Sequence, residues 1–191
     1  MTAITISRQL GSFGDEVGQA IANRLSYRLF SREVINQAAV RAQVPEVALA
    51  TIDDLGLLGL NPSPRAQKAY HQAVRELMEE LASEGNVVII GRAGQVILRD
   101  NPGVLHVKVM APASLRAERI AREQNIPIRS AQEQIRASDQ TRKDYLRRYY
   151  KVRWDDPELY DLIVNTARLT PEGAACLICQ ALTQCILGGN G

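Results

Sequence analysis

The stretch "AITISRQLGSFGDEVGQAIANRL", residues 3–25, constrains the fold most strongly. It begins with a β-branched run and passes through a glycine-containing loop. It then continues with apolar residues at helical spacing, namely Val17, Ala20, Ile21 and Leu25. A strand, a glycine loop and a helix in this order are typical of a phosphate-binding loop, because N–H groups at a helix N-terminus bind anions. The alternative interpretation is an ordinary tight turn between a strand and a helix.

This loop lacks the lysine of the common phosphate-loop pattern G-x-x-x-x-G-K-[ST]. Gly14 stands at the lysine position, and two acidic residues follow it. Arg8 is the nearest cation in the sequence, so it is the candidate to replace the lysine; the alternative is a surface arginine. We predict that the nucleotide-binding loop consists of Gly11, Ser12, Phe13, Gly14, Asp15 and Glu16.

Four further segments are predicted to be strands, at residues 27–30, 86–91, 105–111 and 160–166. Several are near-continuous apolar runs, which is typical of parallel strands that are covered on both faces. Helical patterns lie between and after them, at about 65–84, 112–124, 130–151 and 171–187. The alternation predicts right-handed βαβ units in a doubly wound α/β fold. We expect one domain over 1–191, with a helical excursion at about 32–64.

The amino-acid composition excludes several classes of protein function. Hydrophobic residues make up 46% of the chain, which is enough for a real core, and the net charge of +2 is too small for a general nucleic-acid binder. No apolar run reaches the length of a membrane span, and no signal peptide precedes the first strand, so we expect a soluble, cytoplasmic protein. Cys176 and Cys179 have C-x-x-C spacing without a second pair, which favours buried thiols over zinc. No protein metal site is predicted.

Positive charge is concentrated in one region. Residues 116–153 contain eleven Arg and Lys residues but only five Asp and Glu residues, whereas the whole chain has a net charge of +2. Such a region suits the binding of a triphosphate, because arginines neutralise phosphate oxygens in phosphoryl transfer. The alternatives are a solvated basic helix and a helix that lies on nucleic-acid phosphates.

Three segments together carry a family resemblance. "VVIIGRAGQVIL" (87–98) is a strand followed by Gly-Arg and a short apolar helix, "IRASDQTRKDYLRRYY" (135–150) is an arginine-rich helix, and "YDLIVNT" (160–166) is a last strand. With the glycine loop, this order resembles the cytidylate kinase-like family of P-loop proteins. The resemblance covers nearly the whole chain.

The resemblance implies a P-loop NTPase-type three-layer fold. The parallel sheet would have five strands in the order 2-3-1-4-5, with helices on both faces and a helical lid at about 116–153. It also implies ATP as phosphate donor, a small nucleoside monophosphate as acceptor, and Mg²⁺ held mostly by phosphates and water. Asp15 or Glu16 would then assist in holding Mg²⁺.

The resemblance implies roles for individual residues of this sequence. Arg92 matches the arginine that holds the acceptor phosphate, and Arg32 and Arg147 are further substrate-binding candidates. The catalytic candidates are Arg8, Arg119, Asp139 and Arg142. Three positions that are often acidic in the relatives are here Ser31, Ile90 and Ala93.

Two functions follow from this pattern. The first is a nucleoside monophosphate kinase, with CMP as the acceptor implied by the resemblance alone. The second is a non-catalytic nucleotide-binding sensor, because a lost lysine removes a charge from the transferred phosphate. The sequence does not identify the acceptor or the oligomeric state.

Overall fold

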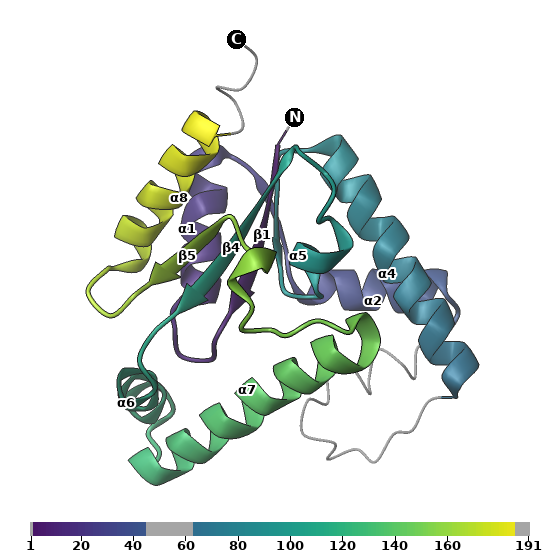
Figure 1. Ribbon diagram of the computed structural model, residues 1–191. Helices are drawn as coiled ribbons and strands as arrows, with labels where there is room; N and C mark the ends of the chain where they lie inside the picture. Colours follow the sequence, from purple (N-terminus) through teal and green to yellow (C-terminus); the bar gives the residue numbers. More distant parts are fainter. Residues whose placement is uncertain (1, 45–62, 186–191) are drawn as a thin grey trace.

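The computed structural model describes residues 2–44 and 63–185 (Figure 1). In the described part of the chain, five parallel strands form one sheet in the order β2-β3-β1-β4-β5. The strands are β1 (Ala3–Arg8), β2 (Arg28–Phe30), β3 (Val87–Ile90), β4 (Val104–Met110) and β5 (Leu162–Asn165). The predicted order is therefore confirmed, with the first strand in the middle.

Helices cover both faces of this sheet. On one face, Ile4 and Ile6 pack with residues of α1 (Gly14–Leu25) and α8 (Pro171–Cys185). On the other face, Val87 and Ile89 pack with residues of α2 (Arg32–Arg41), α4 (Pro64–Glu84) and α5 (Gly94–Ile97). Alternation of side chains along each strand divides the core into these two layers. The three-layer architecture is confirmed, and the part of the predicted excursion at 45–62 lies outside the described residues.

Two helices extend beyond the sheet. The helices α6 (Ala113–Gln124) and α7 (Ile128–Tyr150) join through a small apolar cluster that includes Ile120 and Ile135. Figure 1 shows α7 crossing the end of the sheet toward which the strands point, and its C-terminal end reaches α4. The segment predicted as a lid, at about 116–153, lies mostly in these two helices, and its role as a lid stays a prediction. No helix in the described ranges is long and apolar enough to cross a membrane.

The segment after α7 is held against the sheet by hydrogen bonds between buried polar groups. The indole Nε1 of Trp154, which is 3% exposed, donates to Ser7 Oγ at 2.8 Å. Lys108 Nζ donates to the Trp154 carbonyl oxygen at 2.8 Å and lies 4.8 Å from the centre of its ring. Sequence reasoning missed Lys108, whose signal was a lysine within an otherwise apolar strand. These contacts tie the segment after α7 to β1 and β4.

Lowering the pH from about 7.5 to about 5.5 is expected to destabilise the fold through His106. This buried ring lies 2.7 Å from Thr5 Oγ1, and its burial lowers its pKa although the charge of Asp161 opposes the shift. The unfolded chain then takes up a proton at the ordinary value of 6.5 while the folded protein does not. Stability therefore declines as the pH falls below that value, and the loss levels off below the folded pKa.

Urea unfolding at both pH values tests this expectation. The decline in the free energy of unfolding should be smaller in His106→Asn than in the wild-type protein. Some decline should persist, because burial also lowers the pKa of His71. An identical decline in both proteins would show that His106 does not contribute.

Candidate functional site

The glycine loop lies at the carboxyl end of the middle strand. Gly11 has φ +75° and Phe13 has φ +63°, so the chain turns sharply before α1 begins at Gly14. A Cβ atom at Gly14 would lie 2.3 Å from Arg8 Cβ, so no side chain fits there. The first-turn N–H groups of α1 have no acceptor within the helix. This geometry leaves backbone N–H groups at a helix N-terminus accessible to an anion.

Ser12 supports the loop from inside. Its hydroxyl oxygen lies 2.7 Å from the Gln9 carbonyl and 3.1 Å from the Val109 carbonyl, and its N–H donates to Gln9 at 3.2 Å. The residue is fully buried. Ser12 thus ties the loop to itself and to β4, and its predicted phosphate contact stays a prediction.

Arg8 bridges the loop and the end of β3. Its Nε donates to Asp15 Oδ1 at 3.1 Å, on the first turn of α1. Its Nη1 would lie only 2.9 Å from a Cβ atom at Gly91, the residue after β3. Glycine at positions 14 and 91 therefore leaves the space that this side chain occupies, and its guanidinium lies between α1 and the loop that carries Arg92.

The turn after β3 is held in an unusual backbone conformation. Gly91, Arg92 and Ala93 have φ values of +81°, +54° and +58° in succession. Non-glycine residues in this region cost about 1–3 kcal/mol each and persist where the surroundings enforce them, often at functional sites. A Cβ atom at Gly94 would lie 2.9 Å from Thr5 Cγ2, so α5 starts tightly against β1. The strained turn presents Arg92 at the carboxyl end of β3.

Arg119 contacts the glycine loop through its guanidinium group. Its Nη1 donates to the Gly11 carbonyl at 3.2 Å, and its Nη2 donates to the Thr166 carbonyl at 2.7 Å. Its Cζ lies 3.8 Å from the centre of the Phe13 ring. Burial lowers the pKa of Arg119, against the charge of Glu16. A γ-phosphate contact of Arg119 stays a prediction.

Asp139, a predicted catalytic residue, pairs with a buried arginine in this structure. Arg116 is 4% exposed and donates to both carboxylate oxygens of Asp139, at 3.2 and 2.9 Å. The same guanidinium donates to the Ala111 carbonyl at 3.1 Å and to the Leu10 carbonyl at 3.3 Å. Arg116 therefore joins α6, α7 and the glycine loop. Sequence reasoning counted it only among the lid arginines, since no spacing rule links it to Asp139.

The remaining lid and substrate candidates lie apart from the loop contacts. Arg142 donates to the Ser138 carbonyl at 3.1 Å and to the Ser138 hydroxyl. Arg147 is 76% exposed and pairs with Asp144 at 2.6 Å along the same helix. Arg32 begins α2, and its side chain lies outside the described part of the structure. The roles predicted for these three residues stay predictions.

The carboxylates near the glycine loop are few. Among residues 2–44 and 63–185, no three His, Cys, Asp or Glu residues gather in a way that could hold a metal. Asp15 is engaged with Arg8, and Glu16 is exposed on the first turn of α1. A phosphate-bound Mg²⁺ keeps several waters and needs one or two carboxylates. The contribution of Glu16 to such an arrangement stays a prediction.

Together, the strand order, the glycine loop after the middle strand and the helix pair across the strand ends define a P-loop kinase-type α/β protein. The chain belongs to the cytidylate kinase-like family, whose model matches residues 3–168. It is 27% identical to a cytidylate kinase from Methanocella arvoryzae over 184 residues, which cover 95% of this chain and 97% of the relative.

Solved structures share the fold. An uncharacterized protein from Eubacterium ventriosum has a TM-score of 0.75 at 20% identity, over 95% of this chain and 98% of its own. A gluconokinase from Sinorhizobium meliloti 1021 has a TM-score of 0.60 at 19% identity, over 98% of this chain and 94% of its own. At these identities the likeness establishes the fold alone.

Proposed function

We propose that the protein transfers the γ-phosphate of ATP to a nucleoside monophosphate, with CMP favoured by its family. The observation that carries the proposal is the position of Arg8. Its Nε contacts Asp15 on the first turn of α1, and its Nη1 lies against Gly91, directly before Arg92. One cation thus connects the loop suited to the donor phosphates with the arginine suited to the acceptor phosphate.

In phosphoryl transfer the protein mainly positions the two substrates and neutralises the charge of the transferred phosphoryl group. ATP with Mg²⁺ supplies the phosphoryl group and shields part of its charge. The first-turn N–H groups of α1 bind donor phosphate oxygens, Arg8 takes the place of the absent lysine, and Arg92 orients the acceptor. The lid helix α7 excludes water from the strand ends. We assign the further contacts that position the two nucleotides to Arg32, Arg119, Asp139, Arg142 and Arg147.

A coupled assay of ADP release with CMP, dCMP, UMP and AMP tests the proposal. We expect turnover with at least one of these acceptors and a dependence on Mg²⁺. Binding of an ATP analogue should also change the fluorescence of Trp154, the single tryptophan of the chain, because it anchors the segment after α7. Binding of nucleotides without turnover of any acceptor would contradict phosphoryl transfer.

A second candidate function is a nucleotide-binding sensor without catalysis. The donors of Arg119 are engaged by backbone and hydroxyl oxygens, and Asp139 is engaged by Arg116. If these contacts persist with nucleotide bound, two groups predicted for transfer stay held by protein atoms. Submicromolar binding of ATP with neither hydrolysis nor transfer would favour the sensor.

A further inference from the structure

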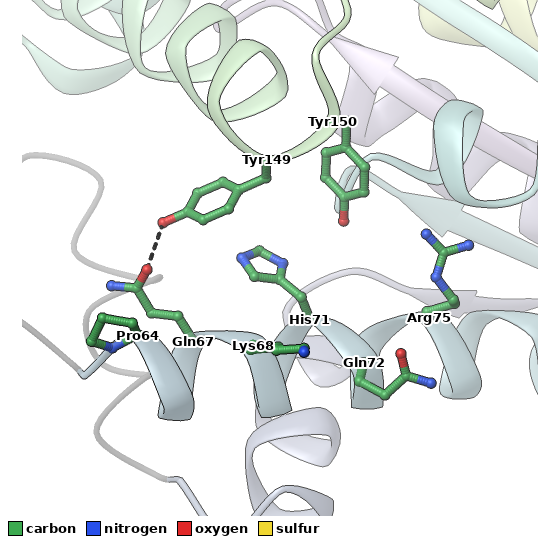
Figure 2. Close-up of a pocket in the computed structure, with 8 residues that line it drawn as sticks. All are labelled: Pro64, Gln67, Lys68, His71, Gln72, Arg75, Tyr149 and Tyr150. Carbon is green, nitrogen blue, oxygen red and sulfur yellow. Dashed lines mark hydrogen bonds between the residues drawn. The ribbon is translucent and has the colours of Figure 1, made fainter.

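The end of α7 lies against α4, and the chain then runs from there to the sheet. Figure 2 shows Tyr149 and Tyr150 projecting from α7 toward α4, beside a pocket of about 380 Å³ that Lys68 and Arg75 also line. Shortly after Tyr150, the buried side chain of Trp154 contacts β1 and β4. The contacts of Trp154 therefore help to decide where the end of α7 lies.

Lys108 on β4 is a buried cation held by a carbonyl oxygen and two aromatic rings. It is 6% exposed, and its Nζ donates to the Trp154 carbonyl oxygen at 2.8 Å. The same Nζ lies 4.8 Å from the centre of the Trp154 ring and 5.1 Å from the centre of the Tyr160 ring. The two carboxylates whose charges act on it, Asp139 and Asp155, each pair with an arginine instead. The aromatic faces thus take the place of a counter-ion.

Stability alone does not account for a lysine at this position. Burial disfavours the ammonium and lowers the pKa of Lys108, although the charges of Asp155 and Asp139 oppose that shift. A methionine would fill a similar volume between the rings, and replacing buried charges by apolar groups is often neutral or stabilising. A methionine cannot donate to the Trp154 carbonyl. The hydrogen bond, and the position that it gives to Trp154, is therefore what the lysine adds.

Trp154 and Tyr160 extend these hydrogen bonds to β1 and to α5. Trp154 Nε1 donates to Ser7 Oγ at 2.8 Å, and Ser7 directly precedes Arg8 in the sequence. The Tyr160 hydroxyl donates to the Trp154 carbonyl at 2.8 Å and accepts from Gln95 Nε2 at 3.4 Å. Gln95 is buried on α5, the helix that follows the strained turn after β3. One network therefore reaches the neighbours of both proposed phosphate-binding arginines.

We propose that Lys108 is a positioning residue that fixes the separation of Arg8 and Arg92. It acts through the Trp154 carbonyl, which accepts from both Lys108 and Tyr160 and lies at the centre of the hydrogen bonds between β1, β4 and α5. The inference rests on the proposed function, in which these two arginines hold the donor and the acceptor phosphates. Lys108 itself is assigned no contact with either nucleotide.

Isothermal titration of the full chain with a bisubstrate analogue, in which adenosine and cytidine are joined by a chain of phosphates, tests this role. The analogue must reach both phosphate sites at once, so its affinity depends on their separation, whereas a non-hydrolysable ATP analogue and CMP each occupy one site. We expect Lys108→Met to bind the bisubstrate analogue about tenfold more weakly than the wild-type protein does, and to bind each single nucleotide within about twofold of the wild-type affinity. A general loosening of the fold would weaken all three ligands.

Three further variants make the test specific. Tyr160→Phe removes the second donor to the Trp154 carbonyl and keeps the ring, so it should weaken the bisubstrate analogue in the same selective way. Lys108→Arg restores a cation and should recover most of the affinity. Lys151→Met makes the same substitution at an exposed lysine shortly before Trp154 and should bind all three ligands as the wild-type protein does. Quenching of Trp154 fluorescence by acrylamide should rise in Lys108→Met and Tyr160→Phe but not in Lys151→Met.

The outcomes distinguish this inference from the proposed function. A selective loss in Lys108→Met, together with no turnover of any acceptor by the wild-type protein, would support the positioning role and contradict phosphoryl transfer. Wild-type turnover, together with wild-type affinity of Lys108→Met for the bisubstrate analogue, would support transfer and overturn the positioning role. Equal weakening of all three ligands, or no binding of the bisubstrate analogue to the wild-type protein, would also overturn it. If Lys108→Met does not fold, Tyr160→Phe decides by the same criteria.

Discussion

The Arg8→Ala variant is expected to transfer phosphate about 10²- to 10³-fold more slowly than the wild-type protein, the loss typical when one preorganised donor to a transition-state charge is removed. Its guanidinium contacts Asp15 on α1 and fills the space beside Gly91, so it bridges these two elements. Alanine leaves the backbone of the loop intact. Most of the loss should therefore fall on kcat, with a smaller change in the affinity for ATP.

The measurement is steady-state kinetics of ADP release with the best acceptor, beside titration of an ATP analogue. Arg24→Ala removes an exposed arginine from the last turn of α1 and serves as the control of matched charge. Gly14→Ala should imitate the loss, because its Cβ atom would lie 2.3 Å from Arg8 Cβ and displace that side chain. A wild-type kcat in Arg8→Ala would remove Arg8 from the mechanism and return the question to the lid arginines.

Breaking the Arg116–Asp139 pair is expected to destabilise the fold by about 3–5 kcal/mol, because removal of one partner leaves a buried charge without compensation. Arg116→Met is the sharper variant. Arg116 is 4% exposed and also supplies donors to the Leu10 and Ala111 carbonyls, so its loss releases α6, α7 and the glycine loop from one another. The free energy of unfolding in urea, followed by circular dichroism, measures the effect.

A double variant separates the pair from its neighbours. Arg116→Met/Asp139→Leu should recover part of the lost stability, because neither charge is then left alone. Arg129→Gln is the control, because it removes one member of the exposed Arg129–Glu133 pair on α7, the helix that carries Asp139. It should lower the free energy of unfolding by less than about 1 kcal/mol. If Asp139→Leu lowered the transfer rate without lowering stability, Asp139 would act on the substrate and not as a partner of Arg116.

The sheet could be predicted because its signals are local. Each buried strand is a short apolar run, and the helix faces repeat at helical spacing, as the buried Leu77, Met78 and Leu81 of α4 confirm. The predicted strand bounds differ from those observed by one or two residues at their ends, where pairing with a neighbour decides how far the strand continues. The strand order rested on the family resemblance, which the sheet confirms.

The candidate site could be predicted only in part. Gly11 and Gly14 follow a strand and precede a helix, so the loop was visible in the sequence. The partners of its charged residues were not. Arg116 and Asp139 lie 23 positions apart, and Arg119 reaches Thr166 over 47 positions. No periodicity links residues at such distances, because only the packing of α6 against the strand ends and α7 brings them together.

The sequence by itself determined the α/β class, the position of the glycine loop between the first strand and the first helix, and the absence of the lysine of the common phosphate-loop pattern. These properties depend on residue types and on spacings within one strand or helix. Only the tertiary structure decided which cation stands beside the loop, because the space that Arg8 occupies is left by Gly14 from α1 and by Gly91 after β3. It also decided that Arg119 and Asp139 are engaged with protein atoms, and that α4 and α7 enclose a basic, aromatic pocket. Such partnerships join segments far apart in the chain, and the folded geometry alone places them within contact distance.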